Sequence, residues 1–211
     1  MQQYFEADLT KTNKKIEGFL ISVRKELNSF FGIKMWQPFV ILVNSRKDID
    51  RMHGRKTEDW LVGWTSGCNI FILKPKVFTK ESSHKDREYF WKVLKHEYCH
   101  LYFKQMTSID YPAWLNEGLA CYLAKQKKTP PSNKEALEIF KYYKKLDKNI
   151  YRIGYFWVNF LIKKFGKNKL MELIKSLKPQ ITEKQFAQNF YRIYKIHYSV
   201  KDFEKLLKTI K

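Results

Sequence analysis

Residues 91–123, WKVLKHEYCHLYFKQMTSIDYPAWLNEGLACYL, contain the pattern H-E-x-x-H at His96, Glu97 and His100. On an α-helix, residues i and i+4 lie roughly 40° apart around the axis and about 6 Å apart along it, so both imidazoles can hold one metal ion. Neutral histidine nitrogen suits zinc. Glu97 follows the first histidine directly, where its carboxylate can reach a metal-bound water as the general base. The stretch therefore predicts a helix that carries a zinc site and a catalytic base.

The five-residue pattern alone is also compatible with a basic helix that exposes two histidines, in a chain that has five. A second segment, WLNEGLA at residues 114–120, favours the metal site because it supplies Glu117 after 16 intervening residues. A catalytic zinc ion needs a third protein ligand and keeps its fourth position for water.

H-E-x-x-H followed at short distance by W-L-N-E-G-L-A resembles the gluzincin metallopeptidases, in particular the branch with the zinc aminopeptidases and the compact peptidase MA-like domains. The resemblance implies that Glu117 is the third ligand beside His96 and His100, and that each chain binds one Zn2+. It also implies a zincin-like fold, a peptide or protein substrate, and Glu97 as the catalytic base of a zinc-dependent peptidase.

A tyrosine further along the chain fits the same resemblance. Peptidases of the aminopeptidase branch place a tyrosine at the start of a helix, three residues before a glycine, where its hydroxyl stabilises the oxyanion of the tetrahedral intermediate. Tyr151 and Gly154 match this Y-x-x-G pattern, and Gly166 closes the helix. Tyr155 lies one turn on and is the competing candidate, and either tyrosine could instead be a packing residue.

The residues that should support the ligands depart from the family pattern. Thermolysin-like chains have an acid four residues after the third ligand, where this chain has Cys121, and aminopeptidases have one seven residues after it, where this chain has Ala124. Support for the histidines must then come from the backbone or from another acid such as Asp110. Cys99, inside the motif, is interpreted as a small buried residue in preference to a zinc ligand.

Residues 60–74, WLVGWTSGCNIFILK, predict a strand, a turn and a second strand. In gluzincins, the strand before the zinc helix is an exposed sheet edge with which an extended substrate pairs. By resemblance, 67–72 is that edge, and Asn69, Ile70 and Phe71 bind the substrate; an ordinary hairpin is the alternative. The segment has no Asp or Glu to pair with a substrate α-amine. This absence favours an endopeptidase over an aminopeptidase.

Apolar periodicity predicts an α+β fold with strands and the zinc helix in the N-terminal half and a helical C-terminal half, and the zincin-like resemblance implies a small mixed or antiparallel sheet. A single domain is expected, with an α+β part at 1–125 and a helical part at 134–211, separated by the basic, Pro-Pro loop at 125–133. Asp8 or Thr10 would cap the first helix. One strand is expected at 38–43, and helices at 8–31, 46–53, 85–106, 112–125, 135–146, 151–166, 168–177, 182–196 and 200–210.

The chain of 211 residues has a formal net charge of +20, which favours some acidic partner but is also what a lysine-biased proteome produces on solvated surfaces. No apolar run of transmembrane length and no signal peptide are recognisable in it, and its three cysteines form no paired motif. A cytoplasmic, reducing compartment is therefore expected. The sequence leaves the oligomeric state open.

Three other functions compete with a peptidase. A metal-stabilised scaffold without activity would not need Glu97. A non-peptidase hydrolase could use the same metal site. A basic, metal-stabilised module that binds nucleic acid or another acidic partner would make the positive surface the function. We expect a zinc peptidase that cleaves internal peptide bonds.

Overall fold

The computed structural model describes residues 13–209 and confirms an α+β fold that is mostly helical. Within that range it has ten α-helices, one 3₁₀ helix and three strands. The chain divides into two compact units, Met1–Leu101 and Tyr102–Lys211, and the division falls inside helix α4 (Tyr89–Thr107). In the described part of the chain, no helix combines the length and apolar character needed to cross a bilayer.

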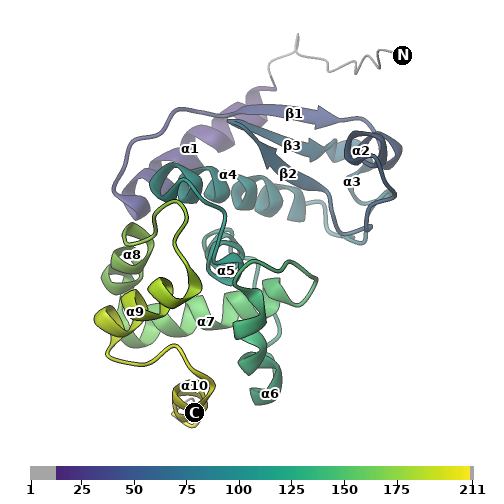
Figure 1. Cartoon of the computed structure of the whole chain (residues 1–211). Coiled ribbons are helices and arrows are strands. Elements are labelled where there is room, and N and C mark those ends of the chain that lie inside the picture. Colours follow the sequence, from purple (N-terminus) through teal and green to yellow (C-terminus); the bar gives the residue numbers. More distant parts are fainter. Residues whose placement is uncertain (1–12, 210–211) are drawn as a thin grey trace. The chain divides into compact units, whose positions relative to one another are not determined.

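The first unit contains a mixed sheet whose strand order is β1 (Phe39–Val43), β3 (Asn69–Leu73) and β2 (Gly63–Ser66). β1 pairs with β3 in parallel and β2 pairs with β3 in antiparallel fashion. The predicted strands at 38–43 and within 60–74 are therefore confirmed, and so is the mixed sheet. Figure 1 shows α4 lying along one face of this sheet.

The prediction that 67–72 is an exposed edge is wrong. Asn69, Ile70 and Phe71 belong to the central strand, where they face Phe39, Val40 and Ile41 on one side and Ser66, Thr65 and Trp64 on the other. Their main-chain groups are used by the sheet, so they do not offer an edge to a substrate. The edge strand of the hairpin is β2.

Helix α1 (Lys14–Phe31) lies beside α4 within the first unit. Asn13 caps it by accepting a hydrogen bond from the Ile16 N–H, and the predicted caps Asp8 and Thr10 lie outside the described residues. A buried stripe runs along the helix, as its apolar periodicity predicts: Ile16, Leu20, Val23, Leu27 and Phe31. Lys95 of α4 donates to both carboxylate oxygens of Glu26 at 2.6 Å, and this ion pair links the two helices.

The segment before β2 is held by one arginine. Arg46, in the first turn of α2 (Arg46–His53), donates from its guanidinium to the main-chain carbonyls of Glu58, Asp59, Leu61 and Glu81. These bonds fix the approach of the chain to Gly63, two residues after Leu61. The short helix α3 (Pro75–Phe78) follows β3, and its Phe78 is fully buried.

The second unit is built around the crossing of α5 (Ala113–Leu123) and α7 (Ile150–Phe165). A Cβ on Gly118 would lie 2.3 Å from the carbonyl carbon of Gly154, so the two backbones meet at a pair of glycines. Because α5 packs on α7, it belongs to the second unit. The division of the chain therefore precedes the predicted loop at 125–133, which connects α5 to α6 (Asn133–Ala136) inside that unit.

The remaining helices agree with their predicted ranges to within a few residues, with one exception. The predicted helix at 135–146 is replaced by α6 and a 3₁₀ helix, η1 (Leu137–Tyr142). The chain ends with α8 (Lys167–Lys175), α9 (Glu183–Tyr194) and α10 (Val200–Leu207). Aromatic side chains fill the core between them, including Trp114, Trp157, Phe186, Phe190, Tyr198 and Phe203.

Candidate metal centre

Helix α4 carries both motif histidines near its middle, where the helix is buried on almost every side. His96 is 5% exposed, Glu97 is 7% exposed and His100 is half-buried. The two imidazole rings approach edge to face, with centroids 4.7 Å apart and planes at 84°. The i and i+4 positions thus bring the rings together on one face, as their spacing predicts.

Helix α5 carries Glu117 in its second turn, and the turn before it is held by its own polar contacts. Pro112 precedes the helix in extended conformation and its carbonyl accepts from the N–H of Leu115 and of Asn116. The buried amide of Asn116 also donates to the carbonyl of Asp110 at 3.2 Å. Asn116 therefore ties the connecting turn to the helix one residue before Glu117, which gives the N-E-G segment a structural reason for its asparagine.

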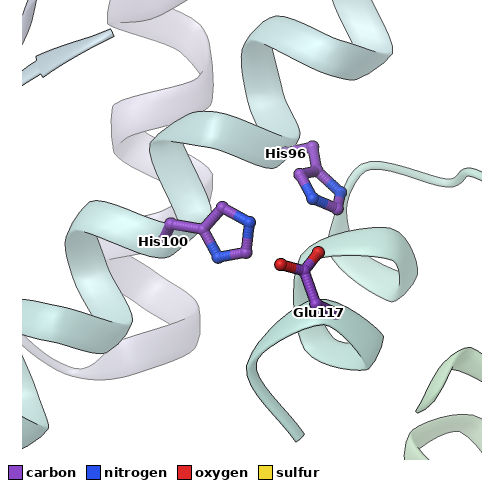
Figure 2. Close-up of side chains that lie close together, drawn as sticks. All are labelled: His96, His100 and Glu117. Carbon is purple, nitrogen blue, oxygen red and sulfur yellow. The ribbon is translucent and has the colours of Figure 1, made fainter. Parts of the chain in front are cut away.

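His96, His100 and Glu117 form a cluster that could hold a metal ion. One ligand atom from each residue lies within 4.8 Å of the others, and Figure 2 shows the two imidazoles of α4 and the carboxylate of α5 directed toward a common point. Zinc bonds of about 2.0–2.2 Å put tetrahedral ligand atoms roughly 3.3 Å apart. Side-chain movements of about an ångström would therefore bring the three ligand atoms to bonding distance of one ion. Two imidazoles and one carboxylate fit a catalytic zinc, because they leave a fourth position open.

Glu97 is not part of this ligand set, which is what a general base acting on a metal-bound water would require. Its side chain lies under the start of β2, where a Cβ on Gly63 would be 3.2 Å from Glu97 Cγ and 3.3 Å from Oε1. Sequence reasoning missed Gly63 as a residue of the site. A glycine inside a strand pattern often marks a close backbone approach, and this signal could have found it.

The two candidate tyrosines lie on α7 on either side of Gly154. Tyr151 is half-buried in the first turn, and Lys128 Nζ lies 5.7 Å from the centroid of its ring. Tyr155 is also half-buried; its burial, with the nearby Tyr122 hydroxyl and Cys121 thiol, raises its pKa. Since Gly118 touches Gly154, Tyr151 and Glu117 leave their helices close to the same crossing.

The candidate supporting residues have other contacts. The side chain of Asp110 is 69% exposed, and its Oδ2 lies 3.4 Å from Lys104 Nζ. Cys121 is buried and its thiol donates to Gln126 Oε1 at 3.4 Å. Ala124 is a buried apolar residue after α5. Cys99 is buried and lies outside the metal-binding group found among residues 13–209, in agreement with its interpretation as a packing residue.

Comparison with known proteins adds no relative: no family model matches the chain, and no curated protein or solved structure matches it significantly. The gluzincin resemblance therefore rests on the motif residues themselves.

Proposed function

We propose that this protein is a zinc-dependent peptidase that cleaves internal peptide bonds. The observation that carries the proposal is the convergence of His96, His100 and Glu117 from two helices, with the carboxylate of Glu97 adjacent in sequence but outside the ligand set. The spacing of these residues resembles the gluzincins, and the α+β fold with an HExxH helix along a small sheet is compatible with a zincin-like architecture.

The metal would be held by His96 Nδ1 or Nε2, the corresponding nitrogen of His100, and a carboxylate oxygen of Glu117. When bound, zinc supplies Lewis acidity, which polarises the scissile carbonyl and brings the pKa of water toward neutrality. The chain's own part is to orient these ligands. The buried position of α4 and the contact of Asn116 with the α4–α5 turn serve that purpose.

Glu97 performs the proton transfers. As the water oxygen bonds to the carbonyl carbon, Glu97 accepts the water proton, and it then passes that proton to the amide nitrogen as the carbon–nitrogen bond breaks. The products are a carboxylic acid and an amine, so the reaction needs no other reactant. A buried carboxylate suits this role because its position is set by packing.

Tyr151 donates a hydrogen bond to the oxyanion that forms on the carbonyl oxygen. Its place in the first turn of α7, three residues before the glycine that contacts Gly118, supports the choice. Tyr155 keeps the competing assignment, and single Phe substitutions at the two positions separate them. The substitution that removes the oxyanion-stabilising hydroxyl should lower kcat by roughly two orders of magnitude, as is typical for loss of an oxyanion donor.

The substrate would pair with β2. The hydrogen bond from the Leu73 N–H to the Val62 carbonyl makes 62 and 73 a bonded pair, so alternation turns the main-chain groups of Gly63 and Thr65 away from β3. No other strand pairs with that side of β2 within residues 13–209. An extended peptide added there would run past Gly63, beside Glu97. This replaces the assignment to Asn69, Ile70 and Phe71.

Internal cleavage follows from the absence of acids in 60–74, since nothing in the hairpin would pair with a substrate's terminal ammonium. A denatured protein substrate should therefore be cut at internal bonds, and blocking its N-terminus should not slow the cleavage.

The decisive experiment compares wild-type protein with Glu97→Gln and with Glu88→Gln, an exposed glutamate just before the same helix. Hydrolysis of unfolded casein should be lost in Glu97→Gln and kept in Glu88→Gln, while both variants retain zinc. Unchanged hydrolysis in Glu97→Gln would contradict the assignment of Glu97 as the general base. Zinc-free protein that binds DNA in a salt-dependent manner would favour the basic binding module instead.

A further inference from the structure

Gly63, the first residue of β2, lies against one turn of α4 with no side chain between them. A Cβ placed on Gly63 would be 2.9 Å from Val93 Cγ1, 3.2 Å from Glu97 Cγ and 3.3 Å from Glu97 Oε1. Val93 and Glu97 are four residues apart, so they present one face of the helix to the strand. All three residues are buried. The strand backbone is thus a wall of the space that the Glu97 side chain occupies.

The two neighbours differ in how they can yield to a larger residue. Val93 is β-branched and has essentially one χ1 rotamer in a helix, so it resists displacement. Glu97 has a longer side chain, and the added Cβ would contact its Cγ and one carboxylate oxygen. An added methyl group at position 63 would therefore push the strand away from the rigid Val93 and displace the Glu97 side chain, whose Cγ and Oε1 it would meet at 3.2 and 3.3 Å.

We propose that Gly63 is a positioning residue for Glu97: the absence of a side chain at 63 lets the carboxylate occupy the position from which it transfers protons. The inference rests on the proposed peptidase function and extends it to the strand that would bind the substrate. Proton transfer requires heavy-atom distances of about 2.6–3.2 Å, so a displacement of a few tenths of an ångström is enough to impair it.

The test is Gly63→Ala, with Gly18→Ala as the matched control because a Cβ on Gly18 meets nothing within 4 Å. With fluorophore-quenched casein as substrate, kcat of Gly63→Ala should fall about tenfold or more while KM stays within about twofold. Zinc content and the absorption spectrum of the cobalt-substituted protein should be unchanged, because the ligands do not move. A crystal structure of Gly63→Ala should show the Glu97 carboxylate displaced. Wild-type kcat in Gly63→Ala, or an unmoved carboxylate, would overturn the inference.

A second variant separates positioning from packing and serves if Gly63→Ala folds poorly. Gly63→Ala/Val93→Ala removes the 2.9 Å contact and keeps those with Glu97, so its kcat should remain low. Recovery of wild-type kcat in the double variant would show that Gly63 only accommodates Val93, and would overturn the inference. Wild-type protein without zinc-dependent hydrolysis would instead overturn the proposed function, and this inference with it.

Discussion

The contact of β2 with α4 in the first unit and the crossing of α5 and α7 in the second both depend on glycine, but they differ in what the missing side chain would meet. At Gly63 the nearest atoms belong to the side chains of Val93 and Glu97. At Gly118 they belong to the backbone of Gly154. A side chain can move by a few tenths of an ångström, whereas two helix backbones can only separate.

The two contacts are therefore expected to have different roles. The first limits where the Glu97 carboxylate can lie, so a side chain at position 63 should lower kcat. The second sets the distance between two helices, so a side chain at position 118 should lower the free energy of unfolding. Both contacts bear on the proposed site. Glu97 lies beside the first, and Glu117 and Tyr151 lie beside the second.

The largest effect is expected from Gly118→Ala. Its Cβ would lie 2.3 Å from the carbonyl carbon and oxygen of Gly154 and 2.8 Å from its Cα, distances that only helix separation relieves. The free energy of unfolding should fall by about 3 kcal/mol or more. Urea denaturation measures this, with Gly18→Ala as the control in open space. A Gly118→Ala protein as stable as wild type would remove the contrast between the two contacts.

A smaller effect is expected from Arg46→Ala, which tests how firmly the chain is held before Gly63. Four main-chain carbonyls would lose their donor, so the free energy of unfolding should fall by about 1–3 kcal/mol and amides near β2 should exchange faster. The control is Arg55→Ala, which loses only an exposed, solvent-screened ion pair with Glu58 and should therefore destabilise the fold far less. Equal losses in the two variants would argue against Arg46 as the anchor of this segment.

The smallest effect is expected on the pH dependence of stability, through the polar tie in which Glu135 of α6 contacts Ser132 and Arg152 of α7. Hydrogen bonds from the Ser132 N–H, the Arg152 guanidinium and the Ser132 hydroxyl lower the pKa of Glu135 from 4.5 to about 2. Because the pKa is depressed in the folded state, the stabilisation is present above about 4.5 and is lost as pH falls from there toward 2.

Glu135→Gln should therefore weaken the fall of Tm with pH in that window, whereas the neighbouring surface change Lys134→Gln should leave its slope alone. The measurement is thermal unfolding followed at several pH values. An identical pH dependence in Glu135→Gln and wild type would show that the tie between α6 and α7 does not stabilise the fold.

Local features could be predicted from the sequence, because their causes are local. The apolar stripe of α1 repeats at steps of three or four residues, and the capping box of α9 joins Thr182 to Gln185 three residues away, so each depends only on neighbouring residues. The pairing of the two histidines on one helix face also follows from helix geometry. The nearness of Glu117 needed the family resemblance, since helix geometry says nothing about the next helix.

Features that depend on distant pairing could not be predicted. The order of the sheet places β1 against β3 in parallel, across 30 residues of chain, and periodicity carries no information about that order. The assignment of Asn69, Ile70 and Phe71 to an edge came from the family resemblance, and nothing in the sequence could correct it. The assignment of α5 to the second unit likewise depends on the contact of Gly118 with Gly154, which lies 36 residues further along.

The most direct test of the central claim is the zinc content of purified protein, measured by mass spectrometry for wild type, His96→Ala, Glu97→Gln and, as control, His197→Ala, which changes a histidine outside the cluster. One zinc per chain is expected in wild type, Glu97→Gln and His197→Ala, with loss in His96→Ala. No zinc in wild type, or equal zinc in His96→Ala, would contradict the account.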